Sequence, residues 1–186
     1  MRGLMVVVCL VFGGCDALGL TTDVQVQSFD TVAAALDRDP DAAVLEFRNV
    51  VLRPDLAGIK TRGSSSVGRS SSGPRRTIVA AMIPLVDEGW TKDEPIAVWI
   101  RLDAAGKSLD APALQKEIAA LQDDAASGSL RVNATQTMPN EVDMDGTNAF
   151  TIGARRAMNE HGLQSPTGAV LATWPAKAKG RLRFVD

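Results

Sequence analysis

Two apolar runs decide the expected fold: Thr77-Ile78-Val79-Ala80-Ala81-Met82-Ile83-Pro84-Leu85-Val86 and Ile96-Ala97-Val98-Trp99-Ile100-Arg101-Leu102. Each run is short, apolar and bounded by polar residues, which is typical of strands. We expect Pro84 to bend or end the first strand. In the second strand, Ile96, Val98 and Ile100 should share one face, with Ala97 and Trp99 on the other. The acidic link at 87–95 is short, so the two strands should form an antiparallel hairpin at the centre of a sheet.

Other segments have the composition and length of shorter strands. We expect them at Val24–Val26, Ala43–Leu52, Leu130–Thr135, Ala169–Trp174 and Arg181–Val185. Glu46 and Arg48 interrupt the apolar residues of the second segment, which predicts a strand half exposed to water.

The clearest helix signal begins at Asp110, a residue type that caps helices, and Pro112 lies in the first turn. Leucine or isoleucine recurs on one helical face, at Leu114, Ile118 and Leu121, and Gly128 is suited to end the helix. Two further helices are expected, over Phe29–Asp39 and Asn148–His161.

The composition is that of a folded domain. The 186 residues are 45% hydrophobic and 23% charged. A chain of this length and composition can bury a core without disulfide bonds or metal ions. The net charge of -2 argues against a general nucleic-acid partner. Strands and helices interleave irregularly, which predicts an α+β fold: a single small domain over residues 24–186, mainly antiparallel sheet with two or three helices.

The segment Gly58–Arg76 has the composition of a loop, and residues 61–76 form its flexible, Ser- and Gly-rich part. Its charged residues are all basic, among them Arg69, Arg75 and Arg76. Contact with anionic lipid headgroups is one interpretation. A solvated loop without a partner is the other.

The first fifteen residues have the layout of an export signal. Arg2 precedes an apolar run from Leu4 to Phe12, and two glycines then lead to Cys15. The run is shorter than the about 20 apolar residues that a membrane-spanning helix needs. We therefore expect a leader that is removed.

The residues Phe12-Gly13-Gly14-Cys15 resemble the lipobox of bacterial lipoproteins, although Phe12 stands where leucine is usual. The resemblance covers only the leader. It implies that residues 1–14 are a signal peptide, that Cys15 receives a diacylglycerol, and that residues 15–23 are a lipidated tether. In enterobacterial lipoproteins an aspartate such as Asp16 marks retention in the inner membrane, but other lineages do not follow this rule.

Two alternatives to lipidation remain open. Ala17-Leu18-Gly19 could be cut by an ordinary signal peptidase, which would give a freely soluble exported protein. The leader could also stay as an uncleaved anchor. If Cys15 is lipidated and Cys9 removed, the mature chain keeps no free thiol, which excludes an internal disulfide and a thiol nucleophile.

The best metal-binding pattern is Glu141-Val142-Asp143-Met144-Asp145-Gly146, which resembles the start of a calcium loop. Its weak candidate ligands are Glu141, Asp143 and Asp145. The twelfth position should be a bidentate acid but is Ile152, so an Asp-Gly turn is the simpler interpretation. We expect no cofactor.

Residues for catalysis are sparse. His161 is the only histidine, and its place at a predicted helix end favours a capping role. No Gly-x-Ser-x-Gly or Ser-x-x-Lys motif is present. Among the tryptophans, Trp99 should lie in the core, whereas Trp90 lies in a polar turn and is the better candidate for ligand contact.

These observations predict a lipoprotein of the cell envelope, on the inner or outer membrane, that works by binding or assembly and not by catalysis. An envelope protein is its possible partner. One alternative is a hydrolase that uses Asp143 and Asp145. Another is a secreted periplasmic ligand binder whose basic loop and Trp90 form the mouth of a site.

Overall fold

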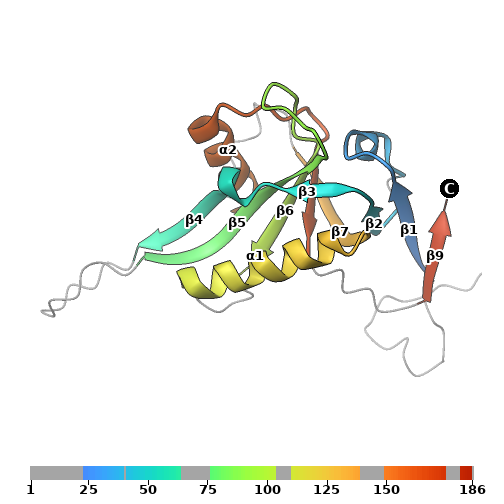
Figure 1. Cartoon of the computed structure of the whole chain (residues 1–186), viewed down its shortest axis with the longest axis horizontal. Helices are drawn as coiled ribbons and strands as arrows, with labels where there is room; N and C mark the ends of the chain where they lie inside the picture. The colour runs from blue at the N-terminus through green and yellow to red at the C-terminus, as the bar shows by residue number, and fades with distance from the viewer. Residues whose placement is uncertain are drawn as a thin grey trace, which may run out of the picture.

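The predicted hairpin lies inside one mixed sheet (Figure 1). This computed structural model describes residues 23–39, 41–63, 76–103, 110–138, 149–174 and 181–185. Within these ranges the hairpin consists of β5 (Arg76–Asp87) and β6 (Val98–Asp103), which pair antiparallel with Ile83 opposite Ile100. The hairpin prediction is therefore confirmed.

Pro84 does not end β5, which continues to Asp87. Pro84 lies opposite Trp99 of β6, and its carbonyl accepts a hydrogen bond from the Arg53 backbone N–H at 3.0 Å. The N and O of one residue point to the same side of a strand, so the missing N–H of Pro84 faces Arg53 and not β6. Arg53 follows the edge strand β3, and no bond of the central ladder is lost.

The remaining strands extend the sheet on both sides of the hairpin. They are β1 (Asp23–Phe29), β2 (Val44–Phe47), β3 (Val50–Leu52), β4 (Gly58–Gly63), β7 (Leu130–Thr137), β8 (Val170–Thr173) and β9 (Arg181–Val185). Their order is β3-β5-β6-β8-β7-β2-β1-β9, and β4 also pairs with β5. Of the eight pairings, β1·β2, β1·β9 and β6·β8 are parallel. The prediction of an α+β domain with a mainly antiparallel sheet is confirmed.

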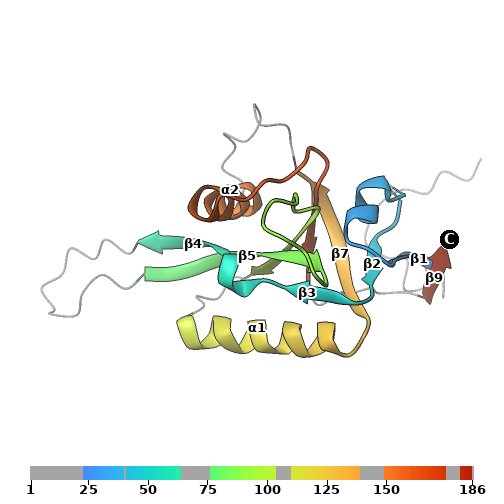
Figure 2. The same cartoon turned by 45° about the horizontal axis from the view of Figure 1, so that its top comes forward.

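Two α-helices cover opposite faces of the sheet (Figure 2). The helix α1 (Ala111–Ala126) begins as predicted, because the Asp110 side chain accepts a hydrogen bond from the Ala113 backbone N–H at 2.9 Å. Leu114 and Leu121 are buried on its sheet side, and Gly128 follows its end with φ +92°. The second helix, α2 (Ala149–His161), packs against β4 and β5.

The core accordingly has two parts. The α1 side of the sheet holds the larger cluster, which includes Leu45, Phe47, Ile83, Ile100 and Leu121. The α2 side holds a smaller one around Met82, Trp99, Ala157 and Leu171. Trp99 is fully buried, as predicted. Ile96 precedes β6 and packs with Trp99, whereas Ala97 packs on the α1 side, so the predicted faces of these two residues were wrong.

Ala43–Leu52 was predicted to be one half-exposed strand, and this prediction is wrong. The chain leaves β2 after Phe47, passes through Asn49 with φ +54°, and pairs again as β3 with a different neighbour. All four residues of β2 are buried, Glu46 included, because β1 and β7 flank the strand.

Phe29–Asp39 is not a helix throughout. Phe29 ends β1, opposite Phe47, and the two rings stack with centroids 5.5 Å apart. Only a 3-10 helix at Ala33–Asp37 remains. Sheet pairing thus overrides the weak helical pattern.

Gly58–Gly63 belongs to the sheet and not to the predicted loop. It forms β4 on the outer side of β5, and Arg76 begins β5 itself. Both ends of the predicted flexible segment at 61–76 are therefore strand, and residues 64–75 lie outside the described ranges. A second 3-10 helix, Pro54–Leu56, separates β3 from β4.

Candidate functional site

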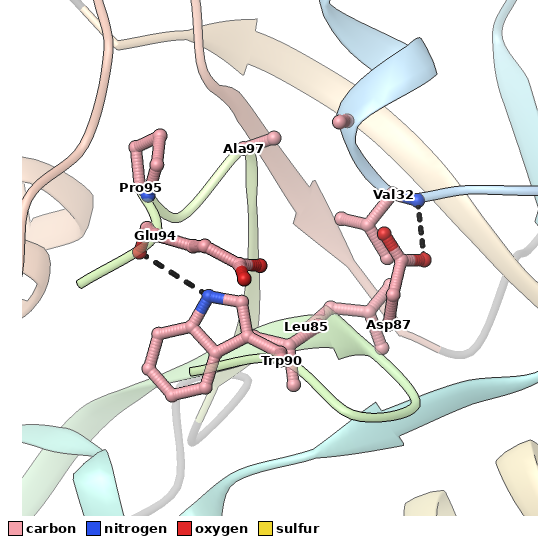
Figure 3. Close-up of a pocket in the computed structure, with 9 residues that line it drawn as sticks. Val32, Leu85, Asp87, Trp90, Glu94, Pro95 and Ala97 are labelled. Carbon is pink, nitrogen blue, oxygen red and sulfur yellow. Dashed lines mark hydrogen bonds between the residues drawn. The ribbon is translucent and has the colours of Figure 1, made fainter. Parts of the chain in front are cut away.

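A cavity of about 230 Å³ opens where β5 ends and the chain turns toward β6 (Figure 3). Its walls are mainly apolar, with an indole and two carboxylates among them. The lining residues are Val32, Ala33, Leu85, Val86, Asp87, Trp90, Glu94, Pro95 and Ala97. Apolar concave sites with a few convergent polar groups are the usual form of binding pockets.

Asp87 holds one wall of the cavity in place. It is the last residue of β5, and its Oδ1 accepts a hydrogen bond from the Val32 backbone N–H at 2.7 Å. This bond joins the start of the 3-10 helix Ala33–Asp37 to the end of a strand 55 residues away. The cavity exists because these two segments meet.

The opposite wall is a compact turn that carries Trp90. The turn reverses at Gly89, which has φ +87°, a conformation that favours glycine. The indole Nε1–H of Trp90 donates to the Glu94 carbonyl at 3.2 Å, and the Thr91 hydroxyl donates to the Glu94 carboxylate at 3.2 Å. These bonds hold Trp90 and Glu94 next to each other in the lining of the cavity (Figure 3).

A cation lies over the Trp90 ring. The Arg53 guanidinium carbon is 5.5 Å from the ring centroid, within the distance of a cation–π interaction. Arg53 also donates two hydrogen bonds to the Asp55 carboxylate, at 2.9 and 2.8 Å. The hydrogen bond from Arg53 holds the pKa of Asp55 below its ordinary value, and the charge of His161 contributes in the same direction. Arg53 does not line the cavity, and the Asp55 carboxylate largely compensates its positive charge.

The structure separates the predicted contact residues. Trp90 lines the cavity, whereas Arg76 begins β5 at the far end of that strand. Twelve strand residues at about 3.3 Å each span roughly 35–40 Å. Trp90 and Arg76 therefore do not form one mouth. Arg69, Arg75, the lipidation candidate Cys15 and the acidic stretch with Glu141, Asp143 and Asp145 lie outside the described ranges.

One wall of the cavity was predictable from the sequence, and the other was not. The composition of 87–95 predicts an acidic, polar turn around Trp90, and this turn forms one wall. Val32 and Ala33 carry no local signal, because only the tertiary bond to Asp87 brings them to the site.

Glu46 is a second polar centre, away from the cavity. Its residue surface is only 4% exposed, and its carboxylate accepts a hydrogen bond from the Arg131 Nε at 2.6 Å. Arg48 lies 3.7 Å away and the Ser28 hydroxyl 3.4 Å away. Burial alone would raise the pKa of Glu46, but the hydrogen bond and charge of Arg131, with smaller contributions from Ser129 and Arg48, lower it below 4.5.

We expect Glu46→Gln to lower the free energy of unfolding by about 2 kcal/mol at pH 7, because it removes the buried charge of an ion pair whose other member, Arg131, keeps access to water. The folded-state pKa is below the unfolded one, so the stabilisation is complete well above pH 4.5 and is lost as the pH falls through the folded-state value. Urea unfolding of wild type and variant at pH 7 and pH 3 measures this. The exposed Glu117→Gln on α1 is the matched control. A difference between wild type and Glu46→Gln that is equal at both pH values would contradict the assignment.

Comparison with protein-family models, with curated proteins and with solved structures found no match. Within the described ranges, no three His, Cys, Asp or Glu side chains are grouped so that they could hold a metal ion. The helices in the same ranges are all too short or too polar to cross a membrane.

Proposed function

We propose that this chain is an exported lipoprotein of the cell envelope, whose single α+β domain binds a partner while lipid on Cys15 holds it at a membrane. The observation that carries the binding role is the cavity between Val32 and Trp90. Its volume of about 230 Å³ is below the about 300–1,000 Å³ of sites that enclose a whole small molecule. A single side chain presented by a partner is a better match in size than a cofactor.

The membrane attachment rests on the sequence. The Gly13-Gly14-Cys15 motif follows an apolar run of signal-peptide length, and a lipoprotein cysteine carries the two or more acyl chains that stable anchoring needs. The first described strand starts at Asp23, so eight Cα–Cα steps lead from the lipidated Cys15 to the sheet. Fully extended, they reach at most about 30 Å. The partner would therefore be met close to the membrane surface.

The attachment is tested by Cys15→Ser in the producing cell. We expect the variant to move from the membrane fraction to the soluble fraction and to lose incorporation of labelled palmitate, because the lipid attachment atom is absent. Cys9→Ser is the matched control, since Cys9 lies in the part removed and its loss should leave the mature protein membrane-bound. Mass analysis of the mature N-terminus should give lipidated Cys15. A product that begins at Leu20, or a Cys15→Ser variant that stays on the membrane, would disprove the attachment.

A further inference from the structure

We infer that the cavity takes the side chain of a lysine from a basic segment of the partner. This inference rests on the proposed binding role and names the chemistry of the occupant. It is carried by the size of the cavity, by its apolar walls and by the sign of the charges in its lining.

The apolar part of the lining suits an aliphatic stem. Leu85, Val86, Pro95 and Ala97 contribute apolar wall on the side of β5 and β6, and Val32 contributes it on the other. Burial of methylene groups against such a surface is favourable by about 0.8 kcal/mol for each group. A short, fully polar occupant would gain nothing from these walls.

The two carboxylates in the lining suit a positive charge at the end of that stem. The side chains of Asp87 and Glu94 approach the same space from opposite sides (Figure 3). Asp87 uses its Oδ1 for the Val32 backbone, and Glu94 accepts from the Thr91 hydroxyl. An ammonium between them would form charge-assisted hydrogen bonds with carboxylate oxygens. A neutral stem would desolvate the two carboxylates without pairing them, and an anion would be repelled.

The surroundings of the cavity favour a basic peptide over an isolated amine. Glu88 and Asp93 are exposed in the same turn and do not line the cavity, so they remain for other basic residues of the partner. The nearby cations do not oppose this. Arg53 is paired with Asp55, and Lys92 is exposed and outside the lining.

The test uses the full chain in neutral detergent with acetyl-Gly-Gly-Lys-Gly-Gly-amide as the probe. The readout is the NMR signal of the Trp90 indole Nε1–H, identified by its loss in Trp90→Phe. We expect a saturable shift, with about tenfold tighter binding than for the same peptide with norleucine, which has a similar stem but no charge. The glutamate peptide should not bind. Butylammonium has the aliphatic stem and the charge of the lysine side chain without the peptide. It should bind more weakly than the lysine peptide.

Variants assign the preference to the cavity. Glu94→Gln should reduce the preference for lysine over norleucine about fivefold. Glu88→Gln makes the same chemical change six residues away on an exposed side chain that does not line the cavity, and it should leave the preference unchanged.

The outcomes separate this inference from the proposed function. Equal binding of the lysine and norleucine peptides would overturn the ammonium assignment while the cavity remained a binding site. Equal binding of butylammonium and the lysine peptide would overturn the peptide partner in favour of a free amine. If no probe moves the Trp90 signal, both the inference and the binding role of this cavity are wrong, whatever Cys15→Ser shows. An equal loss of preference in Glu88→Gln and Glu94→Gln would also overturn the assignment to the cavity.

Discussion

Trp99→Ala is expected to lower the free energy of unfolding by about 4 kcal/mol, the range typical for removal of a fully buried aromatic side chain. Trp99 is 0% exposed and has Pro84 and Leu171 as its register partners on the two neighbouring strands. Its removal leaves a large hole between the sheet and α2. Urea unfolding followed by far-ultraviolet circular dichroism measures the loss.

The substitution also breaks a polar connection. The indole Nε1–H of Trp99 donates to the Ser165 hydroxyl at 3.1 Å, and that hydroxyl donates to the Ile96 carbonyl at 2.8 Å. The segment after α2 is thereby held to the start of β6. We expect backbone amides near Ser165 to exchange faster in the variant.

Trp90→Ala is the matched control for Trp99→Ala. Trp90 is half-buried in a turn, so the same substitution should cost under about 1.5 kcal/mol. Equal losses for the two variants would contradict the central place of Trp99 in the core on the α2 side.

Gly58→Ala is expected to lower the free energy of unfolding by about 3 kcal/mol, at the upper end of the usual cost of overpacking. A Cβ at Gly58 would overlap the Gly153 carbonyl oxygen and lie 2.8 Å from the Ala157 backbone N. Both atoms belong to the main chain of α2, so no side-chain rotation relieves the overlap. The helix must move away from β4, which also disturbs the hydrogen bond of 2.8 Å that the Arg156 guanidinium donates to the Ile59 carbonyl.

Gly153→Ala distinguishes a main-chain clash from general crowding at this contact. Its Cβ would lie 2.5 Å from Met82 Cγ, a side-chain atom that can shift, and alanine also favours the helix over glycine by about 1 kcal/mol. We therefore expect a smaller loss than for Gly58→Ala. Urea unfolding and hydrogen exchange of the α2 amides measure both variants, and wild-type values for Gly58→Ala would refute the close approach of α2 to β4.

The strong local patterns predicted much of this fold. The apolar runs around Ile83 and Ile100 gave the hairpin, and Asp110 with its leucine-rich face gave α1. These signals are local, because a strand or helix with one buried face repeats its apolar residues at a fixed period. The α+β class followed from their irregular order.

The errors arose where distant segments decide the structure. Asn49 turns the chain between β2 and β3 without glycine or proline, and Gly58–Gly63 has no apolar run because it is an edge strand. Phe29 stays extended because Phe47 lies beside it. The candidate site has the same limitation. Trp90 was visible in the sequence, whereas the wall at Val32 depends on a bond to Asp87 across 55 residues.

The position of β1 has a mechanical consequence. The strand lies between β2 and β9 and runs parallel to both. A force applied to Asp23 along the strand would load the hydrogen bonds on its two sides in shear and together, instead of opening them one after another. The sheet would thus resist extraction of its first strand when the chain is pulled from its N-terminal side.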